Sequence, residues 1–304
     1  MKTIIIAYDG SEGAEAIFNE LQHAGLPSQV DAHVIAVAKG WSVPDLAGNV
    51  PISALPVTKP SGLTGRGEAT SEMKAIAEQG AERLREIFPE WSVAAAGLVG
   101  SAAQVIVKRA SEVSADGIFI GSHSRSAVGR FFLGSVSQKV ATEAKCSVHI
   151  CRARQPSGAA PRLLVAVDGS RSAQAAASAV AARTWPAGTA VAVVNVIEPP
   201  LRKGLDSFPP EIADEIRRQH AARLVWLDSM SSAALRILAP AELASERHSL
   251  DGEPKTTLLE WAENWKADCL FIGATGLNDA DDTLGTVASA LAVRAHCSVE
   301  IVRP

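Results

Sequence analysis

The sequence predicts an α/β fold built twice: two tandem, doubly wound domains, each with a five-stranded parallel sheet. Short apolar runs alternate with helix-like segments along the chain, and runs such as Leu164–Val167 suit strands that helices cover on both faces. Three sequence patterns also occur twice in the same order, which indicates a tandem duplication.

The repeated patterns mark the first strand, the fourth strand and the end of each copy. They pair residues 4–11 with 164–170, 115–121 with 267–273, and 134–152 with 285–303. The segment between the copies contains Gln155-Pro156-Ser157-Gly158, a composition typical of a linker. We therefore expect a first domain over residues 1–153 and a second over 160–304.

The first copy predicts five strands and four helices in alternation. Ser11 is placed to cap the first helix, Pro89 ends the second, and the Pro-, Gly- and Ser-rich residues 41–70 predict a long loop. The expected strands are 3–8, 30–38, 91–99, 117–120 and 147–151, and the expected helices are 11–23, 72–88, 102–113 and 136–144.

The second copy predicts the same alternation, with a Pro-rich loop over residues 198–210. The expected strands are 163–167, 190–197, 242–249, 269–272 and 298–302, and the expected helices are 172–183, 211–235, 255–265 and 287–295. Ligands of doubly wound sheets bind beyond the carboxyl ends of the strands. Asp9 and Gly121 both follow strands, so we expect them to share one crevice.

One loop in the first copy has the composition of an anion site. Gly121 ends the fourth strand, Ser124 follows in a loop of small residues, and Gly134-Ser135 opens the next helix. Small residues let backbone N–H groups approach an anion, and a helix start adds unpaired donors and a positive dipole end. The pattern predicts a cradle for nucleotide phosphates; the alternative is a tight connection between strand and helix.

Composition narrows the class of protein. The 304 residues carry a net charge of −4, which does not favour nucleic-acid or anionic-membrane binding. Tyr8-Asp9 interrupts the first apolar run, so we expect no secretory leader, and four cysteines in or beside strand-like runs predict buried thiols in the cytosol. Their spacing with His149 and His296 matches no closed zinc pattern. Neither a Gly-Lys-(Ser/Thr) phosphate loop nor a Gly-x-Ser-x-Gly elbow occurs.

At this point both copies, over nearly the whole chain, resemble the universal stress proteins. Nucleotide-binding members of that family show Gly-x2-Gly-x9-Gly-(Ser/Thr) after the fourth strand and an Asp after the first. The first copy matches with Asp9, Gly121, Gly134 and Ser135, and carries His123 within the loop.

The resemblance implies a Rossmann-like fold of the adenine nucleotide alpha hydrolase type and a pseudo-dimer joined through the last strands. It also implies a cytoplasmic stress-response regulator that binds ATP or another adenine nucleotide, with or without Mg²⁺. The candidate site comprises Ala7, Tyr8, Asp9, Val37, Ile120, Gly121, His123, Ser124, Arg125, Gly134, Ser135, Val136 and Ser137. In the family the second-strand Val, by position Val37, lies near adenine.

Each copy departs from the family pattern. Ser124 stands where the first copy should have its second glycine; a positive φ there would cost about 1 kcal/mol, although the hydroxyl could donate to a phosphate. The second copy keeps Gly273 and Gly276, but only eight residues separate Gly276 from Gly285-Thr286, one fewer than the pattern.

Loop charge separates the copies further. The second loop carries Asp279, Asp281 and Asp282 and no basic residue, whereas the first carries Arg125 and Arg130 and no acid. Phosphate should prefer the first loop electrostatically. We therefore expect nucleotide mainly in the first domain, with the second site weakened or lost although Asp168 is kept. The three aspartates are interpreted as a solvated loop rather than as metal ligands.

Two further functions stay open. One is slow ATP hydrolysis or autophosphorylation at Ser135 or Ser137, for which nothing in the sequence orients a nucleophile. The other is a nucleotide-free protein-interaction module, in which Ser124 and the shortened second loop mark lost binding. The protein partner, and any association of two tandem chains, are not determined by the sequence.

Overall fold

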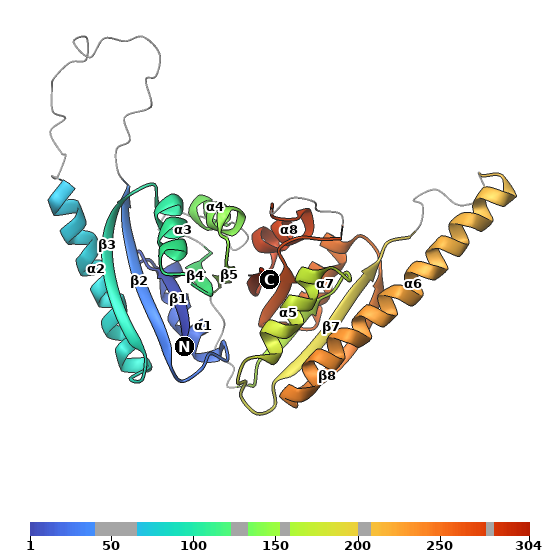
Figure 1. Cartoon of the computed structure of the whole chain (residues 1–304), viewed down its shortest axis with the longest axis horizontal. Helices are drawn as coiled ribbons and strands as arrows, with labels where there is room; N and C mark the ends of the chain where they lie inside the picture. Colours follow the sequence, from blue (N-terminus) through green and yellow to red (C-terminus); the bar gives the residue numbers. More distant parts are fainter. Residues whose placement is uncertain (40–65, 123–132, 153–158, 200–207, 278–282) are drawn as a thin grey trace, which may run out of the picture.

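In a computed structural model, the described residues are 1–39, 66–122, 133–152, 159–199, 208–277 and 283–304. Their strands form one ten-stranded sheet in the order β3-β2-β1-β4-β5-β10-β9-β6-β7-β8 (Figure 1). Every neighbouring pair is parallel except β5 with β10, which is antiparallel. The expected Rossmann-like, tandem α/β fold joined through its last strands is confirmed.

The described elements of the first half follow the expected order, and its buried strand runs form the centre of its sheet. They are β1 (Lys2–Ala7), α1 (Glu12–His23), β2 (Val30–Lys39), α2 (Arg66–Ile87), β3 (Ser92–Gly100), α3 (Ala102–Glu112), β4 (Gly117–Gly121), α4 (Ser135–Glu143) and β5 (Ser147–Cys151).

The second half repeats the order. Its described elements are β6 (Arg162–Ala166), α5 (Arg171–Ala181), β7 (Ala190–Ile197), α6 (Pro210–Leu238), the 3-10 helix η3 (Ala239–Ala241), β8 (Ala244–Asp251), α7 (Pro254–Asn264), β9 (Cys269–Gly273), α8 (Thr286–Arg294) and β10 (Ser298–Val302). The same capping starts the first helix of each half: Ser11 accepts from the Ala14 N–H at 3.2 Å, and Ser170 from the Ala173 N–H at 3.1 Å.

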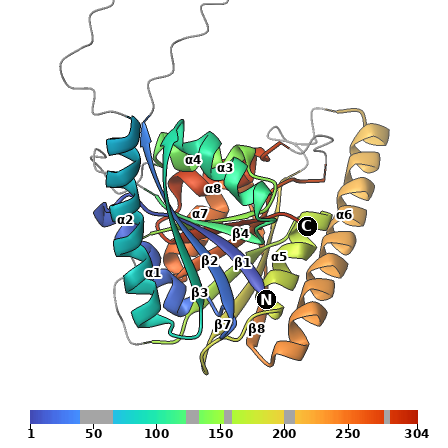
Figure 2. The same cartoon turned by 60° about the vertical axis from the view of Figure 1, so that its left-hand side comes forward.

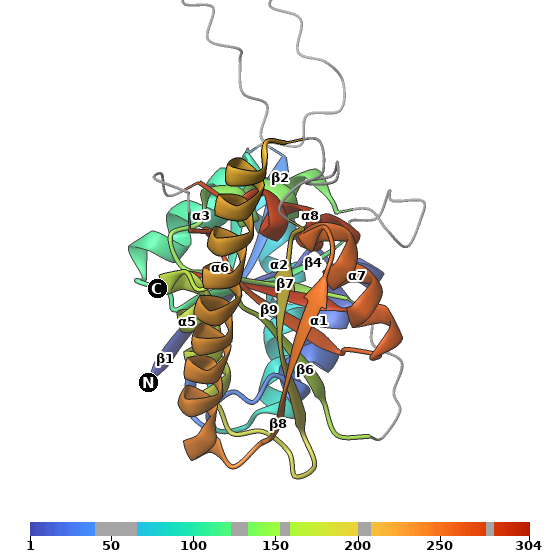
Figure 3. The same ribbon diagram turned by 90° about the vertical axis from the view of Figure 1, so that its right-hand side faces the viewer.

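Helices cover both faces of the sheet (Figure 2). On one face a single apolar core runs beneath α3, α4, α7 and α8 and crosses from one half to the other. On the opposite face there are two cores, one under α1 and α2 and one under α5 and α6. The long helix α6 lies along β7 and β8 at the outer edge (Figure 3). The shared core makes the two halves one packed unit.

The junction between the halves is symmetric in its backbone. On β5 and β10, His149 lies opposite Glu300, the position that corresponds to it in the other half. The backbone N–H of Arg152 donates to the Ser298 hydroxyl at 3.0 Å, and that of Arg303 donates to the Ser147 hydroxyl at 3.2 Å. These reciprocal contacts are those of a pseudo-twofold axis.

Some boundaries differ from the sequence expectation. Residues 66–70, expected in a loop, form the first turns of α2, whose length is set by packing on β2 and β3. The expected strand from Glu242 starts at Ala244, because η3 precedes it and Glu242 is left-handed, with φ of 53°. The remainder of the expected loop, residues 41–65, lies outside the described residues.

All four cysteines are free thiols, with Cys146 half-buried and the other three buried. Burial raises the pKa of each thiol, so the thiol form persists. Among the helices in the described ranges, none combines the length and apolarity that a bilayer span requires.

Candidate functional site

The first crevice lies at the carboxyl ends of β1, β2 and β4, where α4 begins. It encloses a cavity of about 200 Å³. Ten of the candidate residues line it, namely Ala7, Tyr8, Asp9, Val37, Ile120, Gly121, Gly134, Ser135, Val136 and Ser137. The remaining three, His123, Ser124 and Arg125, lie outside the described residues. Sequence reasoning did not identify four apolar residues as part of the site: the buried Ala14, Ile35 and Ile106 and the half-buried Ala102, which complete the described lining.

Close packing requires glycine at the end of β4. A Cβ on Gly121 would lie 2.5 Å from the carbonyl oxygen of Gly13 on α1. The Gly134 N–H donates to the Ser122 carbonyl at 2.8 Å, which fixes the start of α4. Gly134 has no side chain to cap that helix, so the first-turn N–H groups of α4 face the crevice without a side-chain acceptor from their N-cap.

Two polar candidates have structural roles in this geometry. The Asp9 carboxylate accepts from the Ser11 N–H at 3.0 Å, a turn that positions the start of α1. The buried Ser137 hydroxyl donates to the Gly121 carbonyl at 2.7 Å. Ser137 is therefore a poor acceptor for a phosphoryl group, whereas Ser135 is exposed at the helix start.

The second crevice occupies the same place in the second half and is larger. Its cavity measures about 360 Å³, within the usual range of about 300–1,000 Å³ for small-molecule sites. The residues singled out in the second sequence copy all line it: Asp168, Gly273, Gly276, Gly285 and Thr286. A Cβ on Gly273 would lie 2.4 Å from the Ser172 hydroxyl oxygen, so β9 also needs glycine at its end.

Charged side chains from two helices also line the second cavity. Arg223 comes from α6 and Lys255 from the first turn of α7, and neither was identified from the sequence. One signal was available: Arg223 is exposed on α6 four residues before the buried Leu227, and residues at that spacing lie on the same side of a helix.

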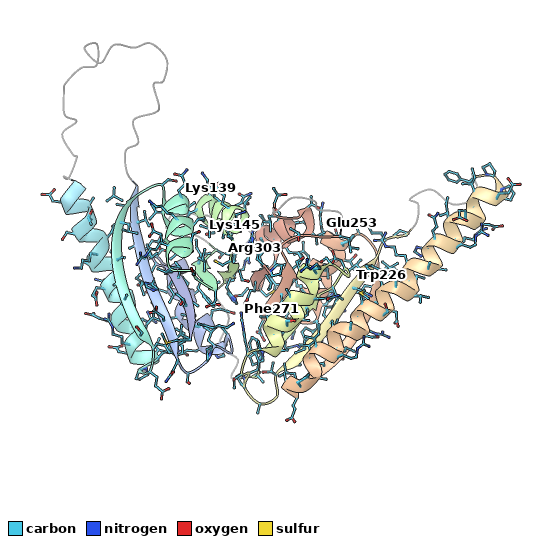
Figure 4. All side chains as sticks on the ribbon, in the orientation of Figure 1. Lys139, Lys145, Trp226, Glu253, Phe271 and Arg303 are labelled. Carbon is cyan, nitrogen blue, oxygen red and sulfur yellow. The ribbon has the colours of Figure 1, made fainter. Side chains whose placement is uncertain are left out.

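Aromatic rings are arranged oppositely in the two halves. In the first half, the ring is that of Tyr8, the residue after β1. Gly80 of α2 lies against this ring, and a Cβ added to Gly80 would lie 2.9 Å from it. In the second half, the ring is that of Trp226 on α6. Gly169, in the turn after β6, lies against this ring, and a Cβ added to Gly169 would lie 2.1 Å from it. Figure 4 shows Trp226 on that long helix and Glu253 at the start of α7.

A buried ion network lies where the halves meet, below the crevices. His149 Nδ1 donates to Glu300 at 2.9 Å and Nε2 donates to Glu20 at 3.1 Å. Glu300 also pairs with Arg183, and the Ser298 hydroxyl donates to Glu20 at 2.9 Å. All the paired side chains are at least nine-tenths buried.

The buried charged groups of the network stabilise one another. Burial lowers the pKa of His149, but hydrogen bonds and charges from Glu20 and Glu300 outweigh it and raise that pKa to about 9. Burial opposes ionisation of Glu300, whereas Arg183 and His149 lower its pKa to about 2. Ligand atoms of Glu20, His149 and Cys269 lie within 4.8 Å of one another. Both nitrogens of His149 already bond to carboxylates, so the arrangement is that of an ion network.

The sequence model described as the Universal stress protein family matches residues 1–152 and 160–303. A universal stress protein of Thermus aquaticus, described by its position in the 3' region of a QAH/OAS sulfhydrylase, is 33% identical over 156 residues, covering 50% of this chain and 98% of that protein. A universal stress protein structure from Archaeoglobus fulgidus is 19% identical with a TM-score of 0.62, covering 99% of this chain and 98% of the other. A universal stress protein solved in complex with cAMP is 26% identical over 48% of this chain and 98% of its own, with a TM-score of 0.28.

Proposed function

Because this chain belongs to the universal stress protein family, we propose that it binds an adenine nucleotide as a regulatory ligand, and that the second crevice is the better-formed site. The observation that carries the proposal is the cavity of about 360 Å³ around Asp168, the glycine loop and the start of α8. A buried apolar wall beside unpaired helix N–H groups suits a ligand with a flat ring at one end and phosphate at the other.

The supporting geometry lies in the described backbone at the start of α8. The Gly285 N–H donates to the Ala274 carbonyl at 2.7 Å, and Gly285, the N-cap of α8, has no side chain to occupy the first N–H groups. Val194, Val196 and Leu258 supply apolar walls. The start of α8 is therefore tied to the residue after β9, and its glycine N-cap supplies no side-chain acceptor.

The first crevice is the second candidate. Its described lining forms a cavity of about 200 Å³, below the usual range, and includes Tyr8 where the second crevice has Val167. The basic residues that favoured it in sequence, Arg125 and Arg130, lie outside the described residues. The expectation that nucleotide binds mainly in the first domain stays a prediction, and cavity geometry argues for the opposite order.

We propose regulation through occupancy rather than turnover. Ser137 is bonded to a backbone carbonyl, which leaves Ser135 as the better-exposed phosphoryl acceptor of the two. ATP as the particular nucleotide, Mg²⁺ as its companion, a cytoplasmic location, a role in the stress response and a protein partner are parts of the same proposal.

Nucleotide carried through purification tests the proposal. Mass spectrometry of the freshly purified, denatured protein should detect an adenine nucleotide, and calorimetric titration of the emptied protein with ATP should give saturable heat. Absence of nucleotide together with a flat titration, with and without Mg²⁺, would leave the nucleotide-free interaction module as the better account. Phosphate release that rises with protein concentration and is lost in Ser135→Ala would instead favour an enzyme.

A further inference from the structure

Resting on the proposed function, we propose that Arg223 and Lys255 are the residues that hold the phosphate end of a nucleotide in the second crevice. They would replace the basic loop residues that the second copy lacks. The ligand class is then a nucleoside polyphosphate, bound more tightly with each added phosphate.

The two cations approach the cavity from opposite faces of the sheet. Arg223 belongs to α6, which packs with α5 on one face, and Lys255 opens α7, which packs with α8 on the other. Both line the cavity together with Gly276 and Thr286 of the strand-to-helix connection. A phosphate chain leaving the start of α8 would pass between two positive charges.

Of the three acids in the same lining, Asp168, Glu198 and Glu253, the first and the last make turn and cap contacts. Asp168 accepts from the Ser170 N–H at 2.9 Å, and Glu253 accepts from the backbone N–H and the hydroxyl of Thr256, each at 2.9 Å. The bond from the Thr256 N–H is the main reason that the pKa of Glu253 is lowered. Two of the three lining acids therefore serve the backbone.

The two basic side chains of the lining, Arg223 and Lys255, differ from these acids in their described contacts. Within the described ranges, neither Arg223 nor Lys255 is in an ion pair, although Lys255 feels the charge of Glu253. Other arginines of α6 do pair on its surface, as Arg217 does with Asp214 at 2.7 Å. The cavity thus has two cations without an ion-pair partner among the described residues, beside the carboxylates of Asp168, Glu198 and Glu253.

The first half has no matching cations in the described lining of its crevice. Lys255 follows the turn Gly252-Glu253-Pro254, and in the first half Gly100-Ser101-Ala102 leads to Ala103, which is buried. The described lining of the first crevice contains no residue of α2, the helix that corresponds to α6, and no basic side chain. Among the described residues, the cation pair is therefore peculiar to the second crevice.

The test titrates the full-length protein with adenosine, AMP, ADP, ATP and inorganic tripolyphosphate by calorimetry. We expect wild-type affinity to rise from adenosine to ATP. Arg223→Gln and Lys255→Gln should each weaken ATP binding about tenfold, and the double variant should weaken it further while adenosine binding is unchanged. Arg236→Gln, which removes an exposed charge from the last turn of the same helix, is the matched control.

The outcomes separate the two proposals. If wild-type protein binds adenosine and ATP equally well, or if the double variant binds ATP as the Arg236→Gln control does, the cation pair is overturned and nucleotide binding stands. If no adenine compound binds but tripolyphosphate does, and the double variant loses it, the cation pair stands and the adenine proposal fails. If none of the five compounds binds, both are overturned. Unchanged circular dichroism of the variants excludes misfolding.

Discussion

The two halves share one backbone fold, but the aromatic ring near the first strand comes from a different element in each. In the first, Tyr8 supplies a ring from the strand end and Gly80 makes room for it on α2. In the second, Trp226 supplies the ring from α6, Gly169 makes room for it, and Val167 takes the place of tyrosine. Tyr8 lines the first crevice, and Val167 lines the second at the corresponding position. Over the described residues, the copy with the shorter loop has the larger cavity, about 360 Å³ against about 200 Å³.

At the junction between the halves, too, the backbone is symmetric but the side chains differ. Positions 149 and 300 face each other across the pseudo-twofold axis, yet one is an imidazolium and the other a carboxylate. Two copies of the first half in this register would place histidine against histidine, and two copies of the second would place glutamate against glutamate. Charge thus favours the pairing of unlike halves.

The largest effect on stability that we expect comes from removing the Glu300 carboxylate from the junction. Glu300→Ala leaves the buried His149 and Arg183 charges without their common partner, and should lower the free energy of unfolding by about 3–5 kcal/mol. Urea denaturation measures it, with Glu86→Ala, an exposed residue of α2, as control. A loss below about 1 kcal/mol would show that the network contributes little to the junction.

The same network predicts a pH window of maximal stability. The pKa of His149 is raised to about 9, so its stabilisation is complete below the ordinary pKa of 6.5 and is lost as pH rises through about 9. The pKa of Glu300 is lowered to about 2, so its contribution is present above 4.5 and is lost as pH falls through about 2. Denaturation midpoints of wild type and His149→Gln should converge from pH 6.5 to 9. Parallel curves over that range would contradict the assignment.

A smaller loss of stability should follow from disturbing the contact between Gly169 and Trp226 in the second half. Gly169→Ala places a methyl group against Trp226 at a φ of 89°, and should cost about 2–4 kcal/mol. Gly188→Ala has a similar φ of 86°, but its nearest neighbour is the Ala160 Cβ at 3.3 Å, so about 1 kcal/mol is expected. Thermal unfolding of both variants provides the comparison. Equal losses would mean that the Trp226 contact does not control this turn.

The sequence was informative where a single segment determines the result. Apolar runs placed the strands, and the positions after β1 and β4 placed Asp9 and Gly121 at one cavity, because parallel strands end at the same edge. The duplication gave the corresponding positions of the second cavity, Asp168 and Gly273.

Contacts between distant segments were not predictable in this way. That Gly80 meets Tyr8, or that Arg223 meets the second cavity, depends on how a long helix is seated on its sheet. Comparing loop charges alone missed cations that arrive from α6 and α7. The facing of His149 and Glu300 likewise depends on strand register, which two short apolar strands do not fix by composition.

One matched pair of variants tests the central claim, that the second crevice is the better nucleotide site. Val37 and Val196 hold corresponding places on β2 and β7, and each lines its own cavity. Tryptophan at either position should fill that cavity alone. Calorimetric titration with ATP should show the tighter binding lost in Val196→Trp and kept in Val37→Trp, with both variants folded by circular dichroism. Binding lost in Val37→Trp and kept in Val196→Trp would contradict the account and assign the nucleotide to the first crevice.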